Sequence, residues 1–472
     1  MSVHVGVFRD ALCREYRISD IGFDTPFAAL NLDLLAIVSV LSQVEESTGI
    51  AFPASLFRDC TCLSDLHKRL GLPTTSTPSI PSSNSLPVRA AAIESDQLVA
   101  IFAAGAGVDN FWATVYPDQQ CLVICYITEA LKQLGCPFEA IPAGSKVVPP
   151  TNVQFRHRQL LDALFDILVD NGLIELLSGS SNSSNGDAQF IRTAVSLPSS
   201  SAADLHERIL HDHPRHANTH KLLHLTAPKL ADCLVGKADP IQTLFGSATG
   251  RDLLQDFYTQ APMSIAASRQ LAELFRRVFL PSQKQNEPIK IVEVGAGFGG
   301  TTGFILEALV SSGVHFQYTF TDVSASFFKT ARQRYQGSGL PVDFEVLDIE
   351  TPAGTPPHMH GQFHAVLSTN CLHATRDLAL SAKNARRLLR PDIDGAFLAL
   401  IEFTERLHWL DLVFGLLDGW WRFADGRRHC LASEAFWKDS LTRAGFDQIV
   451  FTEGRVAGRK PNPQVIVAWN GE

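Results

Sequence analysis

The sequence predicts an α/β domain built on a mostly parallel β-sheet, preceded by a helical region and a small all-α domain. After residue 289, short apolar runs alternate with helical patterns, as in a sheet covered by helices on both faces. A segment rich in proline and serine, residues 72–88, follows the first helical patterns and cannot build a core. We therefore expect a helical domain over 1–75, a linker over 76–95, a helical subdomain over 96–280 and the α/β core over 281–472.

The composition is that of a globular protein and disfavours several classes. Of the 472 residues, 45% are hydrophobic and 19% are charged, and the net charge is −9. An acidic balance without basic clusters argues against a nucleic-acid partner. We find no signal peptide and no run of 18 apolar residues, so we expect no membrane partner. The nine cysteines contain no CxxC pair, which indicates reduced thiols, a cytoplasmic location and no metal site.

Helical patterns fill the chain before the α/β core. Residues 34–49 form an amphipathic pattern that ends at Gly49, and Ser64 suits the N-cap of a second short helix. Further amphipathic helices are expected over 120–135 and 158–177, because apolar residues recur with helical spacing and glycine lies near each end.

A glycine-rich turn follows the first expected strand of the α/β core. The stretch EVGAGFGGTT, residues 293–302, closes an apolar run and opens a helical pattern. Gly295, Gly297 and Gly299 permit a tight turn and the close approach of a ligand to the backbone. A turn of this kind between a strand and a helix is typical of nucleotide-binding loops.

Two acidic residues, Asp322 and Asp348, end the next two expected strands. Ligands bind outside the carboxyl ends of such strands, so both acids should share one edge with the glycine loop. Asp322 would then hydrogen-bond ribose hydroxyls, and Asp348 would reach an adenine amino group. For each acid alone, a helix N-cap is the alternative. Together they predict a nucleoside cofactor, and both NAD and S-adenosylmethionine (SAM) use such a loop.

Glu293 distinguishes between these cofactors. The pattern Glu-x-Gly-x-Gly-x-Gly resembles motif I of class I SAM-dependent methyltransferases. This resemblance implies a Rossmann-like core that binds SAM and releases S-adenosylhomocysteine, with Glu293 helping to organise the methionine end of the cofactor. The final stretch QVIVAWN also suits the reversed last hairpin of that fold.

Polar residues follow the fourth and fifth expected strands. Asn370, Cys371 and His373 come after the fourth strand, and Glu402 ends the fifth. These strands are neighbours in this topology, so His373 and Glu402 should face each other beside the cofactor. A carboxylate orients an imidazole and raises its basicity, as a general base requires. A histidine bonded to a backbone carbonyl is the alternative, and Cys371 as a nucleophile has no support beyond its location.

Several separated motifs, in one order, resemble the C-methyltransferase domain of fungal non-reducing polyketide synthases. They are VEVGAGFGGTT, YTFTDVS, LDIE, NCLHATRDL and DLVFGLLDGWWRFADGR, and the likeness extends over residues 108–470. The resemblance implies methylation of the α-carbon of a β-ketoacyl chain that is held on a carrier protein. It places the base pair on His373 and Glu402, and we expect Asn370 to contact SAM.

The resemblance also suggests residues around the substrate. The stretch FGLLDGWWRFADGRR follows the fifth strand, so it can cover the site. We expect Trp420 and Trp421 to line the acyl and pantetheine channel, with core packing as the alternative. Arg427 is expected to meet a phosphate of the pantetheine arm, with a solvated charge as the alternative. Tyr258, in the helical part, is expected to close over SAM.

The first domain resembles an acyl carrier protein in the frame IGFDTPFAALNLDLLAIVSVL. Carriers hold phosphopantetheine on the serine of an Asp-Ser-Leu sequence, whereas this chain has Asp33-Leu34-Leu35. Leu34 has no hydroxyl group, and Ser39 is displaced from the helix start. The resemblance therefore implies a pseudo-carrier that cannot be loaded.

The chain begins with methionine and shows no ketosynthase, acyltransferase or thioesterase pattern. We therefore expect a standalone C-methyltransferase that acts in trans on a polyketide synthase and its acyl carrier protein, with the pseudo-carrier as a docking element. A single domain excised from a synthase would look the same. Two other hypotheses stay open: a non-catalytic docking subunit of a synthase, and a small-molecule O-methyltransferase with a histidine base.

Overall fold

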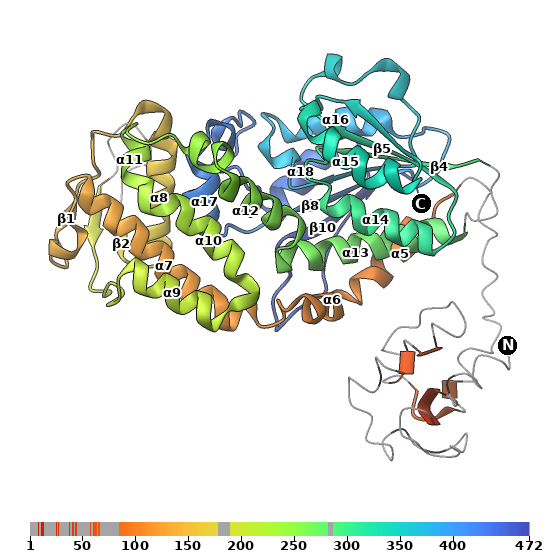
Figure 1. Cartoon of the computed structure of the whole chain (residues 1–472), viewed down its shortest axis with the longest axis horizontal. Helices are drawn as coiled ribbons and strands as arrows, with labels where there is room; N and C mark the ends of the chain where they lie inside the picture. Colours follow the sequence, from red (N-terminus) through yellow and green to blue (C-terminus); the bar gives the residue numbers. More distant parts are fainter. Residues whose placement is uncertain are drawn as a thin grey trace. The chain divides into compact units, whose positions relative to one another are not determined.

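The computed structural model describes residues 85–177, 189–281 and 287–471, together with scattered positions between Phe8 and Leu66. The chain forms two compact units, Met1–Ser83 and Asn84–Glu472, and each is described by itself (Figure 1). Within these described residues, no helix is long and apolar enough to cross a membrane.

The first unit has a small apolar core of its own. Phenylalanine rings meet in it, with ring centroids 5.0 Å apart for Phe27 and Phe57 and 6.1 Å apart for Phe8 and Phe57. Buried leucine, valine and alanine side chains complete this core. Leu34 and Ser64, on which the sequence predictions for this unit depend, lie outside the described residues.

The second unit is built on a seven-stranded sheet with strand order β6-β5-β4-β7-β8-β10-β9. The strands are β4 (Ile289–Val294), β5 (Phe316–Asp322), β6 (Val342–Val346), β7 (Ala365–Thr369), β8 (Phe397–Glu402), β9 (Gln448–Phe451) and β10 (Gln464–Trp469). Strands β4 to β8 are parallel, whereas β10 pairs antiparallel with both β8 and β9. The expected parallel sheet with a reversed final hairpin is confirmed.

Both faces of this sheet are buried, because successive side chains of each strand point into two different cores. In β4, Ile291 belongs to one core and Val292 to the other. The first core is shared with α5 (Val88–Asp96), α13 (Pro262–Phe279), α14 (Gly300–Ser311) and α15 (Phe328–Tyr335). The second is shared with α16 (Leu378–Leu388) and α18 (Glu434–Ala444).

Two of the expected segment boundaries differ from the structure. The linker predicted over 76–95 is shorter, because α5 starts at Val88, directly after Pro87, and packs against α13. Helix α13 falls in the segment predicted as the helical subdomain, yet it covers the sheet. A short alanine-rich helix that follows a Ser/Pro-rich stretch resembles a linker in composition. Its assignment to the folded unit depends on its packing against α13, which the sequence does not show.

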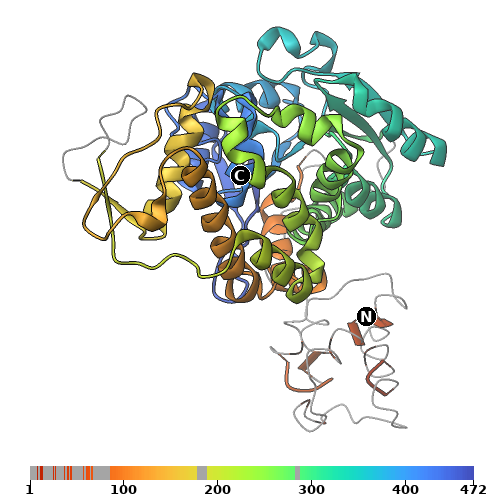
Figure 2. The same ribbon diagram turned by 60° about the vertical axis from the view of Figure 1, so that its left-hand side comes forward.

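A separate core forms the helical subdomain. Its helices are α7 (Phe111–Gln133), α8 (Arg158–Asp170), α9 (Ala202–Asp212), α10 (Ala217–Thr226), α11 (Leu230–Leu234) and α12 (Ala248–Thr259). A small antiparallel sheet, β1 (Lys146–Val147), β3 (Phe190–Arg192) and β2 (Ile174–Leu176), adjoins them. Residues 403–431, here called the post-β8 segment, complete this core and contain α17 (Trp409–Val413). In Figures 1 and 2 this blue segment lies among the yellow and green helices.

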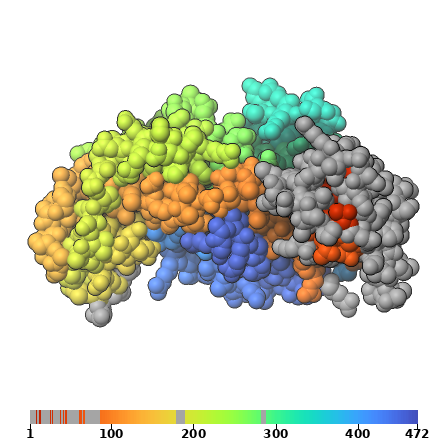
Figure 3. All heavy atoms as spheres, turned by 90° about the horizontal axis from the view of Figure 1, so that it is seen from below, coloured from red at the N-terminus to blue at the C-terminus, as the bar shows by residue number. Residues whose placement is uncertain are grey.

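The start and the end of the second unit meet. Residues 394–395 bond to both: the carbonyl of 394 accepts from the amide of Leu86 at 2.9 Å, and the amide of 395 donates to the carbonyl of Asn470 at 3.3 Å. Asp96, at the end of α5, also accepts the amide hydrogen of Gly454. Figure 3 shows the orange beginning of this unit alongside its blue C-terminal part.

Candidate active site

A cavity of about 580 Å³ opens at the carboxyl ends of the parallel strands. The glycine-rich loop after β4 lines one side, and Asp322, Asp348 and Tyr258 line others. Small-molecule sites usually occupy about 300–1,000 Å³, so a cofactor of nucleoside size fits this space. Open α/β sheets bind their ligands at this edge.

Two glycines of the loop lie too close to their neighbours to carry a side chain. Gly295 has a φ of 66°, and a Cβ there would collide with Sγ of Cys371. A Cβ at Gly300 would collide with the carbonyl oxygen of Tyr258. Gly297, with a φ of 52°, donates its amide hydrogen to Oδ2 of Asp322 at 3.0 Å. These glycines are therefore required by the packing of the loop against the protein itself, and the approach of a ligand to the backbone stays a prediction.

Glu293 is buried behind this loop. Its Oε2 accepts hydrogen bonds from the hydroxyl groups of Thr302, at 2.5 Å, and Tyr318, at 2.6 Å. Burial raises the pKa of Glu293 to about 7, although both hydrogen bonds act in the opposite direction. The carboxyl group thus ties β4 to β5 and α14, and fixes the loop between them.

Asp322 and Asp348 lie at neighbouring strand ends. One oxygen of each carboxylate accepts a backbone amide two residues later, from Ser324 at 2.8 Å and from Glu350 at 2.9 Å. Burial raises the pKa of Asp322, against the effect of its backbone hydrogen bonds. Both acids therefore shape the local turn, and each oxygen can still accept a further hydrogen bond from a ligand.

Asn370, directly after β7, combines a left-handed backbone conformation with an unmatched polar atom. Its φ of 47° is left-handed, a region that few residues other than glycine adopt, although asparagine is among those that tolerate it. Its Oδ1 is buried on the cavity wall and has no hydrogen-bond partner among the described residues. A ligand that donates a hydrogen bond would relieve this cost. The next residue, Cys371, is a poor nucleophile, because burial raises the pKa of its thiol to about 12.

His373 and Glu402 form a buried pair. Nδ1 of His373 lies 2.6 Å from Oε2 of Glu402, whose side chain is fully buried. We assign the proton to Nδ1, because the carboxylate can only accept, and this leaves the lone pair on Nε2. Among the described residues, the ring contact recorded for His373 is the one through Nδ1, and Nε2 makes none. Cys371 and Ala374, on either side along the chain, line the cavity, whereas the largely buried His373 is not itself part of the lining.

An aromatic group closes the cavity from the helical subdomain. Tyr258, in α12, stacks on Phe298 of the glycine loop with ring centroids 6.1 Å apart, and it contacts Phe414 at 6.2 Å. All three rings line the cavity. Burial raises the pKa of Tyr258 well above its ordinary value, so its hydroxyl stays neutral.

Family models and solved structures agree with this geometry. Models described as "Methyltransferase domain", "Methyltransferase, Helix-turn-helix domain" and "Phosphopantetheine attachment site" match residues 292–395, 94–180 and 7–70. The CMeT domain of the citrinin polyketide synthase is 34% identical, with a TM-score of 0.73 that covers 82% of this chain and 97% of that one. The CurJ carbon methyltransferase is 25% identical, with a TM-score of 0.67 over 81% and 99%.

The polyketide methyltransferase ustM of Ustilaginoidea virens is 40% identical over 94% of this chain and 95% of its own length. The chain belongs to the polyketide C-methyltransferases. The non-reducing polyketide synthase pkbA of Emericella nidulans is 43% identical over 75% of this chain, which spans only 13% of that synthase. The resemblance inferred from the sequence motifs is therefore confirmed, including the carrier-like region before the methyltransferase.

Membership of the C-methyltransferase family implies SAM as the methyl donor, and the cavity fits it. The glycine loop leaves backbone exposed, two carboxylates lie at adjacent strand ends, and Asn370 offers an unmatched acceptor. Hydroxyl and ammonium groups of a nucleoside-containing amino acid would supply the missing donors.

The tryptophans of this C-methyltransferase lie away from the channel predicted for them. Trp420 and Trp421 are buried in the core of the helical subdomain. Nε1 of Trp420 donates to Asp411 at 3.0 Å, and Nε1 of Trp421 donates to the carbonyl of Gly415 at 2.7 Å. The post-β8 segment lines the cavity with Phe414, Leu417 and Arg422 instead.

Arg427 is buried as well, which does not fit the expected contact with a phosphate. Its guanidinium pairs with Asp425 at 2.8 Å and donates to the carbonyl oxygens of His373, at 2.9 Å, and Thr375, at 2.6 Å. The arginine that lines the cavity is Arg422, whose side chain is about half exposed.

Asp411, which sequence analysis missed, anchors the post-β8 segment. It accepts hydrogen bonds from Trp420, from Nε2 of His429 at 2.8 Å and from Arg406 at 2.9 Å. Burial by itself would raise the pKa of Asp411. The contacts with His429 and Arg406 outweigh this effect and hold that pKa well below its ordinary value. Nδ1 of His429 accepts from the amide of Leu431, so its proton lies on Nε2. A lone aspartate inside the apolar run HWLDLVFGLL is the signal that could have revealed it.

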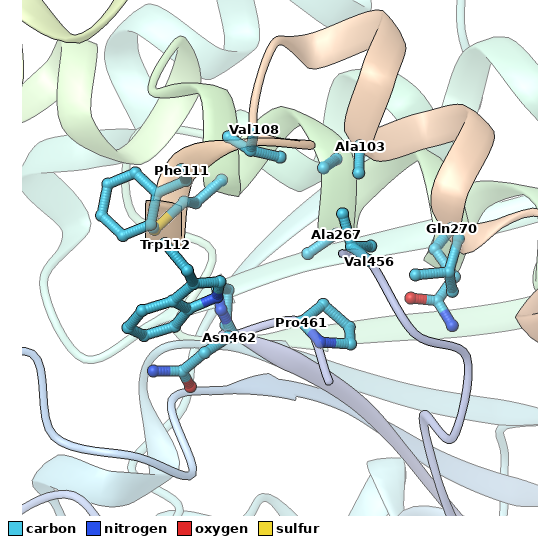
Figure 4. A pocket seen from close by; sticks show the side chains of 13 residues that line it. Ala103, Val108, Phe111, Trp112, Ala267, Gln270, Val456, Pro461 and Asn462 are labelled. Carbon is cyan, nitrogen blue, oxygen red and sulfur yellow. The ribbon is translucent and has the colours of Figure 1, made fainter. Parts of the chain in front are cut away.

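A second, smaller cavity lies between α6 (Val99–Ala106), the start of α7, α13 and the C-terminal loop (Figure 4). Its volume is about 40 Å³, room for a few water molecules but not for a cofactor. Its polar side chains are satisfied, since Gln270 bonds Thr452 and Asn462 accepts from the amide of Thr404. It is a packing gap in the C-methyltransferase rather than a cofactor site.

Proposed function

We propose that this protein transfers the methyl group of SAM to the α-carbon of a β-ketoacyl thioester on the carrier protein of a partner polyketide synthase, acting in trans. The observation that carries the proposal is the buried His373–Glu402 pair, 2.6 Å apart, with Cys371 and Ala374 beside His373 in the cavity lining. A carbon acceptor must lose a proton before it can be methylated, whereas amines and thiols need less help. A positioned base contributes about 10²–10⁴-fold to such a step.

The chain's own residues divide this work. Nε2 of His373 accepts the α-proton, and the electron pair of the broken C–H bond moves into the enolate of the substrate. Glu402 holds Nδ1–H and stabilises the imidazolium that forms, because its carboxylate is buried and pairs with no other cation in the part of the chain that the structure describes. When bound, SAM supplies the electrophilic methyl group to which the enolate carbon bonds. The buried position of the pair keeps water away from the base.

Residues at the strand ends would hold SAM. Gly295 and Gly297 give the methionine part access to the backbone, and Glu293 fixes the loop that carries them. Asp322 suits the ribose hydroxyls and Asp348 the adenine amino group, because each lines the cavity with a carboxylate.

Two further cavity residues complete the cofactor half of the proposal. Oδ1 of Asn370 suits the ammonium group of SAM, since it is an acceptor without a partner among the described residues. Tyr258 would cover the cofactor, since its ring stacks on the glycine loop. On the acceptor side, Phe414 and Leu417 offer apolar wall for the acyl chain.

The carrier-like region would serve as a docking element. Support comes from the phosphopantetheine-site model over residues 7–70, combined with Leu34 at the position where a carrier has serine. Because Leu34 cannot be loaded, the acyl chain must arrive on another carrier. The relative ustM supports action in trans, since the match covers 95% of that protein and leaves no room in it for synthase domains.

Methylation of three acceptors tests the catalytic part. A β-ketoacyl pantetheine thioester, the same chain on a carrier protein and a free phenol are each incubated with SAM and protein. We expect methylation at carbon of both thioesters and a loss of about 10²–10⁴-fold in His373→Ala, with SAM affinity unchanged. Preferred methylation of the phenol would establish O-methylation instead. If His373→Ala restored the output of a partner synthase as well as the wild type does, the protein would be a docking subunit.

Deletion of residues 1–83 tests the docking part. The carrier-bound substrate should lose at least about tenfold in kcat/KM, an affinity loss of roughly 1.4 kcal/mol, while the free thioester loses less than about twofold. Leu34→Ser is the matched control in the full chain and should leave both rates unchanged. Equal losses for both substrates on deletion would contradict a docking role.

A further inference from the structure

We infer that Arg427 and Trp420 are positioning residues for the imidazole of His373, one through its backbone and the other through its ring. The inference rests on the proposed role of His373 as the base. It replaces the substrate contacts that the sequence suggested for both residues, because neither side chain lines the cavity wall formed by the described residues.

The turn that carries His373 has little support of its own. It is a three-residue 3₁₀ helix, Leu372–Ala374, separated by Cys371 from Asn370, whose φ is left-handed. Short 3₁₀ segments have poor hydrogen-bond geometry and few internal bonds. The orientation of the imidazole therefore depends on contacts from outside this turn.

Arg427 supplies the backbone contacts. Its side chain is only 2% exposed, and Nη1 and Nη2 donate to the carbonyl oxygens of His373 and Thr375, on both sides of the end of the turn. Nε pairs with Oδ1 of Asp425, whose Oδ2 accepts from the amide of Leu378 at the start of α16. The planar guanidinium also donates to the carbonyl of Cys430, so it holds three carbonyls and a carboxylate in one fixed geometry, which a lysine cannot reproduce.

Trp420 supplies the ring contact. Its indole lies edge-to-face with the imidazole of His373, with centroids 5.7 Å apart at 75°. The opposite neighbour is Phe414, stacked at 5.7 Å and 24°, which itself lines the cavity. Nε1 of Trp420 is anchored on the buried Asp411. The indole therefore cannot turn without breaking a hydrogen bond to a buried carboxylate.

One stretch of chain thus holds His373 from three directions. Glu402 ends β8 and fixes Nδ1, and the following post-β8 segment brings Trp420 to the ring and Arg427 to the carbonyl. Catalytic groups misplaced by about 1 Å lose on the order of 10²-fold in rate. We therefore expect these contacts to raise kcat, by positioning His373, as well as to stabilise the fold.

Four variants test the inference in the full chain. Arg427→Lys keeps a positive charge beside Asp425 but loses the several N–H donors of the guanidinium. The double variant Asp425→Asn/Arg427→Met removes both charges, so that no buried charge is left unpaired. Arg427→Met and Trp420→Phe complete the set. We expect kcat for the β-ketoacyl thioester to fall about 10–100-fold in both methionine variants and about 5–20-fold in Arg427→Lys and Trp420→Phe. The dissociation constant of SAM should stay within about twofold, because these side chains do not line its cavity.

Two buried residues outside the site provide matched controls. Arg192, in β3, donates to the carbonyls of Leu173, Thr193 and Val195, so Arg192→Met removes the same kind of backbone clamp. Trp437, in α18, is fully buried, so Trp437→Phe removes an equal volume of indole from the core. Both controls should lower the unfolding temperature with less than about a twofold change in kcat.

Ring-nitrogen NMR of His373, assigned by comparison with His373→Ala, supplies a signature that stability alone would not move. We expect the Nδ1-protonated tautomer to dominate in the wild type and in both controls, and to lose population in the Arg427 and Trp420 variants. The positioning role is wrong if kcat and the tautomer are unchanged in all four variants, or if the controls lower kcat equally. If His373→Ala itself keeps full methylation, the proposed base is wrong, a separate outcome.

Discussion

Among the described residues, two largely buried histidine–carboxylate pairs contact the ring of Trp420, and they differ in how the second ring nitrogen of the histidine is used. In the first pair, Nδ1 of His373 donates to Oε2 of Glu402 at 2.6 Å, and Nε2 has no partner among the described residues. In the second pair, Nε2 of His429 donates to Oδ1 of Asp411 at 2.8 Å, and Nδ1 accepts the amide hydrogen of Leu431 at 3.0 Å. Trp420 lies edge-to-face with both imidazoles, at 5.7 Å and 5.9 Å.

The difference teaches that a histidine beside a carboxylate is a candidate base only when its second nitrogen is left open. Both ring nitrogens of His429 are hydrogen-bonded, so its role is to hold Asp411 in place. His373 has one open nitrogen and lies between residues that line a cavity, so it is the candidate for taking a proton. Sequence spacing alone does not distinguish the two arrangements.

The largest effect should come from Glu402→Gln, which breaks the first pair. The amide keeps the size of the side chain but removes the charge that stabilises the imidazolium, so kcat should fall about 10²–10⁴-fold. Single-turnover methylation of a β-ketoacyl pantetheine thioester measures this, with SAM titration as the control for an intact cofactor site. A rate above about one third of the wild type would remove Glu402 from the mechanism.

Asp411→Asn, in the second pair, should act mainly on stability. Asp411 compensates Arg406 and accepts three buried donors, so breaking the group should cost about 3 kcal/mol of unfolding free energy. Because the folded state depresses the pKa of Asp411, its ionised form stabilises the fold above the unfolded pKa, near 4, and that contribution is lost as the pH falls through the lower folded value.

Denaturant unfolding from about pH 6 down to about pH 2 measures this dependence. The wild type should lose more unfolding free energy than Asp411→Asn as the pH falls below about 4. Identical pH slopes for the two proteins would show that Asp411 is not held ionised by its neighbours.

The smallest effect should come from His429→Gln, which keeps a donor near Asp411. The shorter reach of the amide weakens one of three hydrogen bonds to the carboxylate, at a cost of about 1 kcal/mol at most, and kcat should fall less than about fivefold. Thermal unfolding and the thioester assay on the same preparation measure both quantities. If His429→Gln matched the loss in His373→Ala, the functional distinction between the two pairs would be wrong.

Much of the fold and part of the site follow from local sequence patterns. Alternating strands and helices predict the parallel sheet, and adjacency of the fourth and fifth strands brings His373 to Glu402. The glycine loop, Asp322 and Asp348 were placed on one edge for the same reason, and all line the cavity. These predictions succeed because strand order determines which loops meet.

Predictions for the post-β8 segment did not succeed in the same way, for a physical reason. Its residues pack against helices more than a hundred positions earlier, so local periodicity does not say which aromatic faces the cavity. The sequence offered Trp420 and Trp421, and the structure lines the cavity with Phe414 and Leu417. Arg427 was expected in solvent or on a phosphate, because its buried acceptors are backbone carbonyls, which leave no trace in the sequence.

Leu86, near the start of the second unit, and Asn470, near its end, bond to the adjacent residues 394 and 395. This proximity of the two ends bears on how the fold is distributed among proteins. A unit whose entrance and exit lie at one corner can be inserted into a longer chain, or removed from it, without stretching its core. The match to nearly all of ustM and to 13% of the synthase pkbA is what such a portable cassette would produce. Exchange of the unit between separate enzyme and synthase would then require changes only in the connecting segments.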